Sequence, residues 1–229
     1  MKILAIGAHP DDIEIFMYGM LSVYLNRGDE IYMIVVTDGS AGDVLAKSNL
    51  AEIRKQETTN ALKRFGKPIF LEFSDGQLSI QNQAVNVLKE YMHELNPDLI
   101  ITHAPEDYHP DHRVLSEYVK TSASFKYPII YCETLLGINF NPQFYIDISK
   151  YFESKKIAIL KHKSQSPEKF LNAIEISNTF RAAQCNAGNN SYAEVFRFEP
   201  SFPFVDISSL LPDSLPLRPY YKNLPDSLI

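Results

Sequence analysis

The chain has 229 residues, of which 45% are hydrophobic, and a formal net charge of −6 at pH 7. This length and apolar content fit one domain with a full core, and the scatter of Lys and Arg excludes a basic groove for nucleic acid. The two cysteines stand outside any Cys-x-x-Cys pair, so no disulfide framework is expected. No apolar run approaches the roughly 20 residues of a membrane-spanning helix, and no leader pattern precedes the first strand. We therefore expect a soluble, cytoplasmic protein.

Five short apolar runs predict buried strands, and helical patterns separate them. The expected strands cover residues 3–6, 31–36, 68–71, 99–102 and 129–131. The expected helices cover residues 13–26, 50–65, 85–95 and 114–122. Gly28 and Gly66 act as stop signals after the first two helices.

This alternation predicts an α/β fold with a Rossmann-like, doubly wound, mostly parallel sheet that carries helices on both faces. Right-handed crossovers favour the strand order 3-2-1-4-5. In that order the first and fourth strands lie side by side at the switch point, where ligands bind beyond the carboxyl ends of the strands. Polar residues that follow these two strands are therefore expected to meet.

The pattern beyond residue 131 predicts strands at 144–148 and 192–198 and helices at 151–163 and 170–185. From Pro200 onward, five more prolines stand among apolar residues, so regular structure is not expected there. We interpret residues 1–200 as a single domain and residues 201–229 as a proline-rich tail, packed on that domain or on a neighbouring subunit. The tail therefore indicates a homo-oligomer.

Two clusters of imidazoles and carboxylates follow the first and fourth expected strands. The first spans residues 9–12, with the sequence HPDD, and the second spans residues 109–112, with the sequence HPDH. Zinc in hydrolases usually takes three ligands from His and Asp or Glu and leaves one position for water. The remaining groups can then move a proton or face a developing oxyanion. The candidate site residues are His9, Asp11, Asp12, His109, Asp111 and His112.

The spacing of these candidates in the sequence assigns only some of their roles. Asp11 and Asp12 are adjacent, so their side chains point in different directions and take different roles. His9 and Asp12 are three residues apart at a helix start and can face one ion, whereas either histidine of the second cluster fits as a further ligand. A carboxylate at such a position also caps helices. Two such clusters at adjacent strand ends favour the functional interpretation.

Both clusters resemble the motifs of the zinc-dependent N-deacetylase family that includes the phosphatidylinositol-glycan class L (PIG-L) and LmbE-like enzymes. The resemblance spans residues 1–200 and extends to Glu14, Thr37-Asp38-Gly39 with Gly42, Arg54-Lys55-Gln56-Glu57, Asp75-Gly76-Gln77-Leu78 and His162-Lys163-Ser164-Gln165. Members of this family remove acetyl groups from N-acetylglucosaminyl compounds, or hydrolyse related amides, on a Rossmann-like fold. The resemblance therefore implies an N-deacetylase with a small amino-sugar substrate and zinc, or alternatively iron(II), as its metal.

The resemblance also implies a role for each motif residue. The metal ligands correspond to His9, Asp12 and His112. Asp11 corresponds to the general base that takes a proton from water and returns it to the leaving amine. His109 corresponds to the group that polarises the amide carbonyl, oriented by Asp111, and Arg54 to a substrate-binding residue.

Several positions depart from the family pattern or keep two interpretations. Relatives carry a Gly-Gly pair where this chain has Tyr18-Gly19, so we expect Tyr18 to reshape the pocket. Arg54 also fits an exposed helix arginine paired with a nearby Glu, and His162 fits either a pocket residue or a surface histidine. His103 fits a residue that finishes the fourth strand. Roles as partners of the site or as turn formers stay open for Asp38 and Asp75.

Three other functions compete with deacetylation. An amidase that acts on a related sugar conjugate would use the same site. A mononuclear non-haem iron oxygenase also uses two histidines and a carboxylate, but such sites usually lie on antiparallel sheets. A non-catalytic Rossmann-like ligand-binding module lacks support, because no Gly-x-Gly-x-x-Gly follows the first strand.

Overall fold

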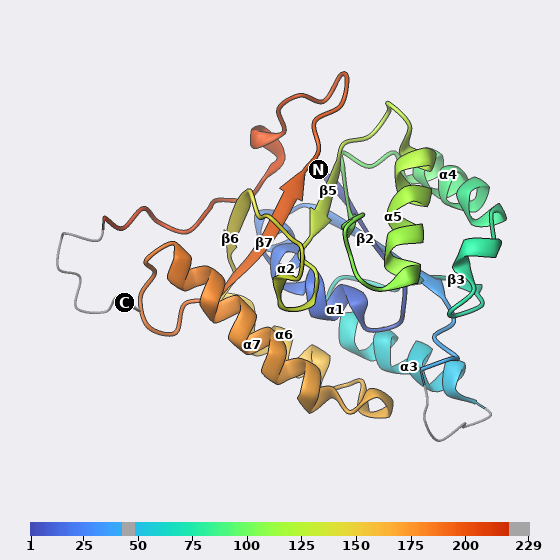
Figure 1. Cartoon of the computed structure of the whole chain (residues 1–229), viewed down its shortest axis with the longest axis horizontal. Helices are drawn as coiled ribbons and strands as arrows, with labels where there is room; N and C mark the ends of the chain where they lie inside the picture. The colour runs from blue at the N-terminus through green and yellow to red at the C-terminus, as the bar shows by residue number, and fades with distance from the viewer. Residues whose placement is uncertain (43–48, 220–229) are drawn as a thin grey trace.

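A seven-stranded sheet forms the centre of the protein in a computed structural model that describes residues 1–42 and 49–219 (Figure 1). Its order is β3-β2-β1-β4-β5-β7-β6, so the predicted order 3-2-1-4-5 is confirmed for the first five strands. Those five strands are parallel, and β7 is antiparallel to β5 and β6. The strands are β1 (Lys2–Gly7), β2 (Glu30–Thr37), β3 (Ile69–Phe73), β4 (Leu99–His103), β5 (Ile129–Cys132), β6 (Phe144–Asp147) and β7 (Ala193–Phe198).

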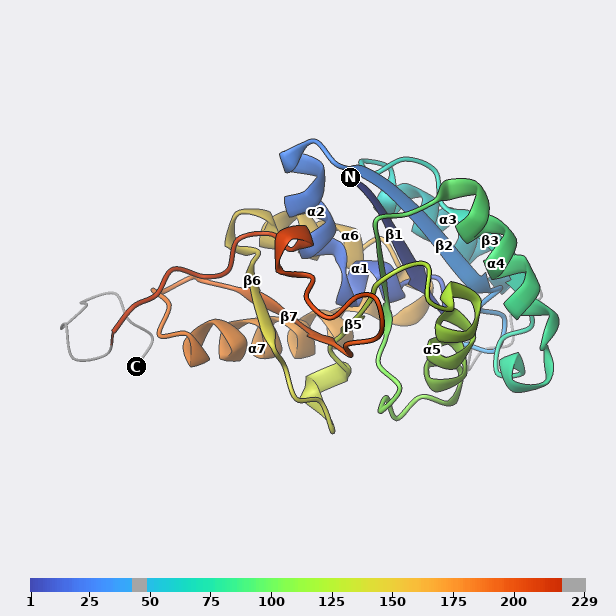
Figure 2. The same cartoon turned by 90° about the horizontal axis from the view of Figure 1, so that it is seen from above.

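Helices cover both faces of this sheet, as a buried parallel sheet requires (Figure 2). Ile3 and Ala5 of β1 face a core shared with α1, α2, α3, α6 and α7, whereas Leu4 and Ile6 face a core shared with α4 and α5. None of the helices in the described ranges has the length and apolar character needed to cross a membrane. The helices are α1 (Asp12–Phe16), α2 (Tyr18–Arg27), α3 (Leu50–Leu62), α4 (Gln83–Leu95), α5 (Pro110–Ala123), α6 (Phe152–Ile159) and α7 (Pro167–Gln184).

The helix expected at residues 13–26 is two helices that meet at Met17, so that prediction is wrong in its continuity. Glu194 of β7 causes the break, because its carboxylate accepts hydrogen bonds from the backbone N–H groups of Gly19, at 2.8 Å, and Met20, at 2.7 Å. Gly19 also leaves room for Ile148, which would lie 2.5 Å from an added Cβ. A residue far along the chain therefore starts α2.

The helix expected at residues 151–163 is shorter than predicted, because α6 ends at Ile159 and the 3₁₀ turn η4 (Lys163–Gln165) follows it. The described part of the proline-rich segment has little regular structure, as expected, apart from the 3₁₀ turn η5 (Ser208–Leu210). Ile207 and Leu215 of this segment are buried against the rest of the chain, and a bridge joins Ser214 to Ile146 of β6. The domain division at residue 200 and a contact to a neighbouring subunit stay predictions.

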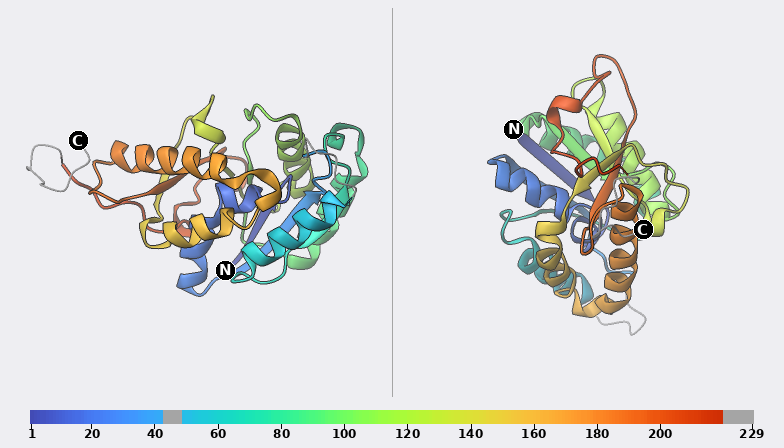
Figure 3. Two further views of the ribbon diagram at one scale, coloured as in Figure 1. Left: turned by 90° about the horizontal axis from the view of Figure 1, so that it is seen from below. Right: turned by 90° about the vertical axis from the view of Figure 1, so that its left-hand side faces the viewer.

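The helices α6 and α7 lie side by side (Figure 3), and a buried polar network links them to α2 and β7. The ammonium of Lys155 lies 2.8 Å from Glu194 Oε1 and donates to Asn178 Oδ1 at 3.1 Å. Lys155 and Glu194 are 1% and 3% exposed as side chains, so neither charge is solvated by bulk water. Removing one partner of such a pair leaves the other charge uncompensated in the interior.

We expect Glu194→Ala to lower the free energy of unfolding by about 3–5 kcal/mol, since it strands the Lys155 ammonium and two backbone N–H groups. Urea denaturation measures this change. Glu153→Ala is the matched control, because the Glu153–Lys156 pair lies at the surface, where such pairs contribute about 0–1 kcal/mol. Equal losses for the two variants would contradict this account of the network.

Candidate active site

The site lies beyond the carboxyl ends of the parallel strands, at the switch point between β1 and β4. The residues after β1 supply the first cluster, the turn after β3 supplies Asp75, and the start of α5 supplies the second cluster. A pocket of about 310 Å³ opens there. Members of both sequence clusters line it, namely His9, Asp11, Asp12, His109 and His112. The folded chain therefore brings together residues that stand a hundred positions apart.

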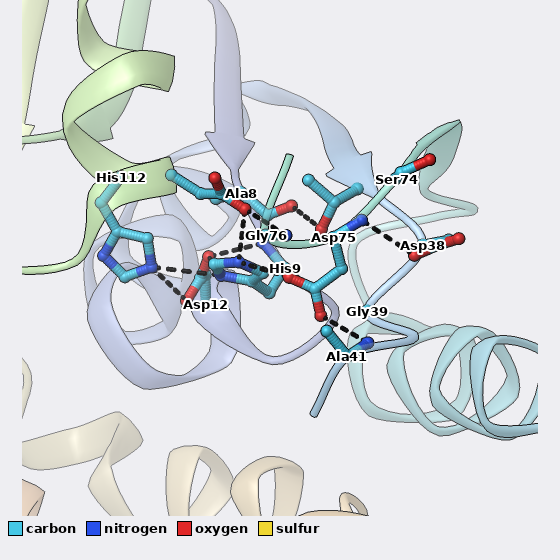
Figure 4. A network of polar contacts seen from close by, with 12 residues as sticks. Ala8, His9, Asp12, Asp38, Gly39, Ala41, Ser74, Asp75, Gly76 and His112 are labelled. Atoms are coloured by element: carbon cyan, nitrogen blue, oxygen red, sulfur yellow. Dashed lines mark hydrogen bonds and ion pairs between the residues drawn. The ribbon is translucent and has the colours of Figure 1, made fainter. Parts of the chain in front are cut away.

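Three of these residues point at one another (Figure 4). His9 Nδ1 lies 3.2 Å from His112 Nε2 and 3.3 Å from Asp12 Oδ2, and His112 Nε2 lies 3.3 Å from Asp12 Oδ1. Zinc bonds of about 2.0–2.1 Å in a tetrahedral site place their ligand atoms roughly 3.3–3.4 Å apart. The nitrogen and oxygen atoms of His9, Asp12 and His112 therefore have the spacing and the chemistry to hold a small divalent cation.

Carboxylates contact the outer nitrogens of both histidines. Asp107 Oδ2 lies 3.0 Å from His112 Nδ1, and Asp75 Oδ1 lies 3.2 Å from His9 Nε2. Metal-binding histidines usually present their second nitrogen to such an acceptor, which fixes the orientation of the ring. The sequence analysis left the role of Asp75 open and missed Asp107. The signal for Asp107 was its position five residues before His112, in the loop between β4 and α5.

His103 also belongs to the site, beyond its role as the last residue of β4. Its ring is 1% exposed and stacks on His112 with the centroids 3.7 Å apart. Its Nε2 lies 3.0 Å from Asp12 Oδ2, so Asp12 meets three imidazoles. The interpretation that His103 simply finishes the strand is therefore incomplete.

Burial and close charges shift the pKa values of these groups in opposite directions. Burial disfavours the charged form of His112, but the carboxylates of Asp12 and Asp107 outweigh it and raise the pKa of His112 to about 9. The pKa of His9 is raised in the same way, by Asp12, Asp111 and Asp75 against burial. Burial and the charge of His112 lower the pKa of His103 to about 4. The carboxylates therefore favour positive charge at His9 and His112, which protons or a bound cation would supply.

Asp11 has an unusual backbone for a residue other than glycine, with φ at 139°. Backbone strain of this kind concentrates at functional sites, where the surrounding structure holds it in place. The Asp11 carboxylate makes no capping hydrogen bond to α1, so the capping interpretation is wrong for this residue. Burial raises its pKa against the opposing charge of Arg54. A buried carboxylate with a raised pKa suits proton transfer near neutral pH.

Arg54 of α3 is 4% exposed, so the interpretation of an exposed helix arginine is wrong. Its Nη2 lies 3.1 Å from Asp11 Oδ2 and donates to the carbonyl of Pro10 at 2.9 Å. Its Nη1 donates to the carbonyl of Gly39 at 2.9 Å. Gly42 permits this packing, because an added Cβ there would lie 2.6 Å from Arg54 Nη1. Arg54 therefore holds Asp11 at the pocket wall.

His109 and Asp111 do not pair as predicted. Asp111 Oδ2 accepts a hydrogen bond from the backbone N–H of Gly76 at 2.8 Å and lies 3.5 Å from His9 Nε2. His109 lines the pocket, and its buried Nδ1 has no hydrogen-bond partner among the described residues. Asp111 therefore supports His9, because the first turn of α5 directs its side chain toward the β3 turn rather than toward the His109 ring.

The structure also shows what surrounds Tyr18 and His162, whose roles the sequence analysis left open. Tyr18 is buried against Phe65, with ring centroids 5.0 Å apart, and it is absent from the pocket wall, so the prediction that it reshapes the pocket is wrong. His162 is 2% exposed, and its Nε2 lies 2.8 Å from Glu14 Oε1, so it is not a surface histidine. Asp38 accepts hydrogen bonds from the backbone N–H groups of Ser40 and Asp75 and so shapes the turn beside the site.

The fold and site define a Rossmann-like α/β protein with a candidate cation site at its switch point. The sequence profile of the PIG-L family, described as GlcNAc-PI de-N-acetylase, matches residues 4–123. The chain is 31% identical over 172 residues to the uncharacterized deacetylase YaiS of Escherichia coli K12, which covers 71% of this chain and 90% of YaiS. The chain belongs to the PIG-L family.

Two solved structures share the fold. The N,N'-diacetylchitobiose deacetylase of Pyrococcus horikoshii superposes with a TM-score of 0.77 at 26% identity, over 87% of this chain and 84% of that one. The 4-carboxy-2-hydroxymuconate hydratase GalB of Pseudomonas putida KT2440 superposes with a TM-score of 0.75 at 17% identity, over 86% and 95%. The similarity to GalB shows the fold alone.

We expect binding of a divalent cation at this site to release protons, because His112 has a pKa of about 9 and must be neutral to serve as a ligand. Cation affinity should therefore rise between pH 6 and pH 8, by about tenfold per pH unit for each proton released. Isothermal titration of zinc in buffers with different ionisation enthalpies measures the release. An affinity that does not change with pH would contradict the assignment.

Proposed function

We propose that this protein is a metal-dependent hydrolase that removes the N-acetyl group from an N-acetylglucosamine-type amino sugar or its conjugate. The observation that carries the proposal is the triangle of His9, Asp12 and His112 beside the buried carboxylate of Asp11 in one pocket. Membership of the PIG-L family and the similarity to the Pyrococcus deacetylase support it. The reaction is hydrolysis of an amide to acetate and a free amine.

The proposed metal is zinc, held by His9, Asp12 and His112, with iron(II) as the alternative ion. Spacings of 3.2–3.3 Å between the nitrogen and oxygen donors support this choice of ligands. When bound, such an ion polarises a carbonyl and lowers the pKa of a water to about 7. Asp75, Asp107 and Asp111 would keep the two histidine rings oriented.

The protein side chains then divide the proton transfers between them. Asp11 takes a proton from the attacking water and returns it to the nitrogen of the leaving amine. Arg54 holds Asp11 in place through the contact of 3.1 Å and favours its ionised form before the reaction. His109, in the wall of the same pocket, donates a hydrogen bond to the oxygen that develops negative charge.

Arg54 is the proposed substrate-binding residue, and the geometry sets a condition on that role. Both of its terminal nitrogens donate to protein oxygen atoms, in Asp11, Pro10 and Gly39. A substrate carboxylate or phosphate would have to replace one of these acceptors. We therefore assign to Arg54 the positioning of Asp11 as its first role.

The competing functions predict different behaviour. An amidase that acts on a related sugar conjugate would use the same residues and differ only in the acyl group or sugar. An iron oxygenase would need dioxygen, and a non-catalytic ligand-binding module would release no amine. Hydration, the activity named for GalB, would add water to a substrate without releasing an amine. Cytoplasmic location and a homo-oligomeric state stay predictions from the sequence.

We expect the zinc-loaded protein to release amine and acetate from at least one member of a panel of N-acetylglucosaminides under anaerobic conditions. Dialysis against a chelator should remove the activity, and added zinc should restore it, because the ion supplies the polarised water. Fluorescence labelling of primary amines measures the product. Activity that survives complete metal removal, or no amine from any member of the panel, would overturn the proposal.

We expect Asp11→Asn to keep the bound zinc and to lower kcat by about 100-fold to 10,000-fold, the range that general acid–base groups contribute. Asp12→Ala should instead lose most of the zinc, because it removes one of three ligands. Metal analysis of the purified variants separates the two roles. Loss of zinc in Asp11→Asn, or full zinc content in Asp12→Ala, would show that the two carboxylates are assigned the wrong way round.

A further inference from the structure

The active-site pocket has two chemically different sides. One side is polar and includes Arg54, Asp75 and Gln165. The other side is apolar and includes Ile15, Phe16, Tyr108, Leu135 and Phe170. The proposed chemistry places the amide beside His9, Asp12 and His112, between these two sides, and it leaves the apolar side without a role.

Leu135, the first residue of the 3₁₀ turn η2 (Leu135–Gly137), lines the pocket. The next residue, Leu136, lines a separate small cleft that shares Ile15 and Phe16 with the pocket wall. Leu136, Ile138 and Tyr108 are 54%, 48% and 49% exposed. We call Tyr108, Leu135, Leu136, Ile138 and Phe170 the apolar rim.

Leu136 adopts a left-handed backbone conformation, with φ at 56° and ψ at 21°. This conformation is unfavourable for a residue with a Cβ, and asparagine or glycine is its usual occupant. Burial does not offset the cost, since Leu136 is 54% exposed. Strained residues that stability does not explain are common at functional sites.

An ion pair and a hydrogen bond fix the turn that contains Leu136. Glu133 forms a buried ion pair with Arg181 of α7, whose Nε donates to Glu133 Oε1 at 2.7 Å. Gly137 lies directly on this pair, because an added Cβ would be 2.5 Å from Arg181 Nη2. The Thr134 hydroxyl closes the turn by donating to the carbonyl of Ile138 at 2.6 Å. These contacts hold the η2 part of the apolar rim in place.

We propose that the apolar rim binds the aglycone of the substrate, and that this aglycone is an aryl or alkyl group. The inference rests on the proposed deacetylase function and adds the substrate class. A volume of about 310 Å³ is at the lower end for ligand pockets, so one sugar ring occupies the pocket and its substituent lies across the rim. An apolar substituent gains by covering Leu136 and Ile138, whereas a second sugar would leave its hydroxyl groups without partners there.

The test compares kcat/KM for methyl, phenyl and octyl N-acetylglucosaminides and for diacetylchitobiose, all with the zinc-loaded protein. We expect the phenyl and octyl glycosides to exceed the methyl glycoside by about tenfold or more, since each buried methylene contributes about 0.8 kcal/mol, or roughly fourfold. Equal values for all aglycones, or a preference for diacetylchitobiose, would overturn the inference. A protein inactive on every member would instead overturn the proposed deacetylase function.

Leu136→Asn tests the rim itself, because asparagine tolerates the left-handed backbone but removes the apolar side chain. We expect the octyl-to-methyl ratio of kcat/KM to fall toward one while the melting temperature stays level or rises. A purely structural role of Leu136 would lower the melting temperature and leave the ratio unchanged. Leu217→Asn is the matched control, since Leu217 is 98% exposed and belongs to the C-terminal segment, which contributes no described residue to this pocket.

The same measurements separate an aglycone from a membrane surface as the partner of the rim. Sedimentation with vesicles of phosphatidylcholine and phosphatidylglycerol should show no binding, in keeping with a net charge of −6 on the chain. Vesicle binding that Leu136→Asn abolishes, together with equal activity on all aglycones, would assign the rim to a lipid surface and overturn the proposal.

Discussion

The burial of Asp12 among three imidazoles is the interaction on which the site depends. Its carboxylate is 3.0 Å from His103, 3.3 Å from both His9 and His112, and it also accepts the backbone N–H of His9 at 2.7 Å. A carboxylate removed from water costs several kcal/mol unless such partners surround it. Burial acts to raise its pKa, but the charges of the histidines lower it well below the usual range. The ionised Asp12 carboxylate therefore stabilises positive charge at this one position, either on the histidines or on a bound cation.

Three further carboxylates add to the negative charge around the histidines. Asp75, Asp107 and Asp111 face the outer sides of His9 and His112, so negative charge surrounds the two rings on several sides. A divalent cation would balance this charge more completely than protons on the two rings. The local charge, and not only the spacing of three ligand atoms, thus favours a cation at this position. Each proton on His9 or His112 would have to leave before that ring nitrogen could serve as a ligand.

The architecture of the sheet does not determine which reaction takes place at this site. The Pyrococcus deacetylase and the hydratase GalB share the fold with this chain, and a fold by itself does not determine a reaction. The residues that would distinguish substrates lie on the connections, such as η2 and the loop before α5. α7 supports η2 through the pair Glu133–Arg181, and the pair Lys155–Glu194 joins α6 to β7. The second half of the chain therefore adds Leu135, Gln165 and Phe170 to the pocket, while the first half supplies its reactive groups.

The order of the first five strands and the meeting of the two clusters follow from the amino-acid sequence, because hydrophobic periodicity and right-handed crossovers are local rules. The break at Met17, the burial of Arg54 and the partners of His9 and His112 do not follow from it. Those outcomes depend on contacts between distant residues, as when Glu194 caps α2 across 175 positions. Asp111 shows the limit most clearly, since the family resemblance implied His109 as its partner and packing gave it another, His9. Periodicity assigns a residue to an element, whereas its neighbours across the pocket follow from how the elements pack.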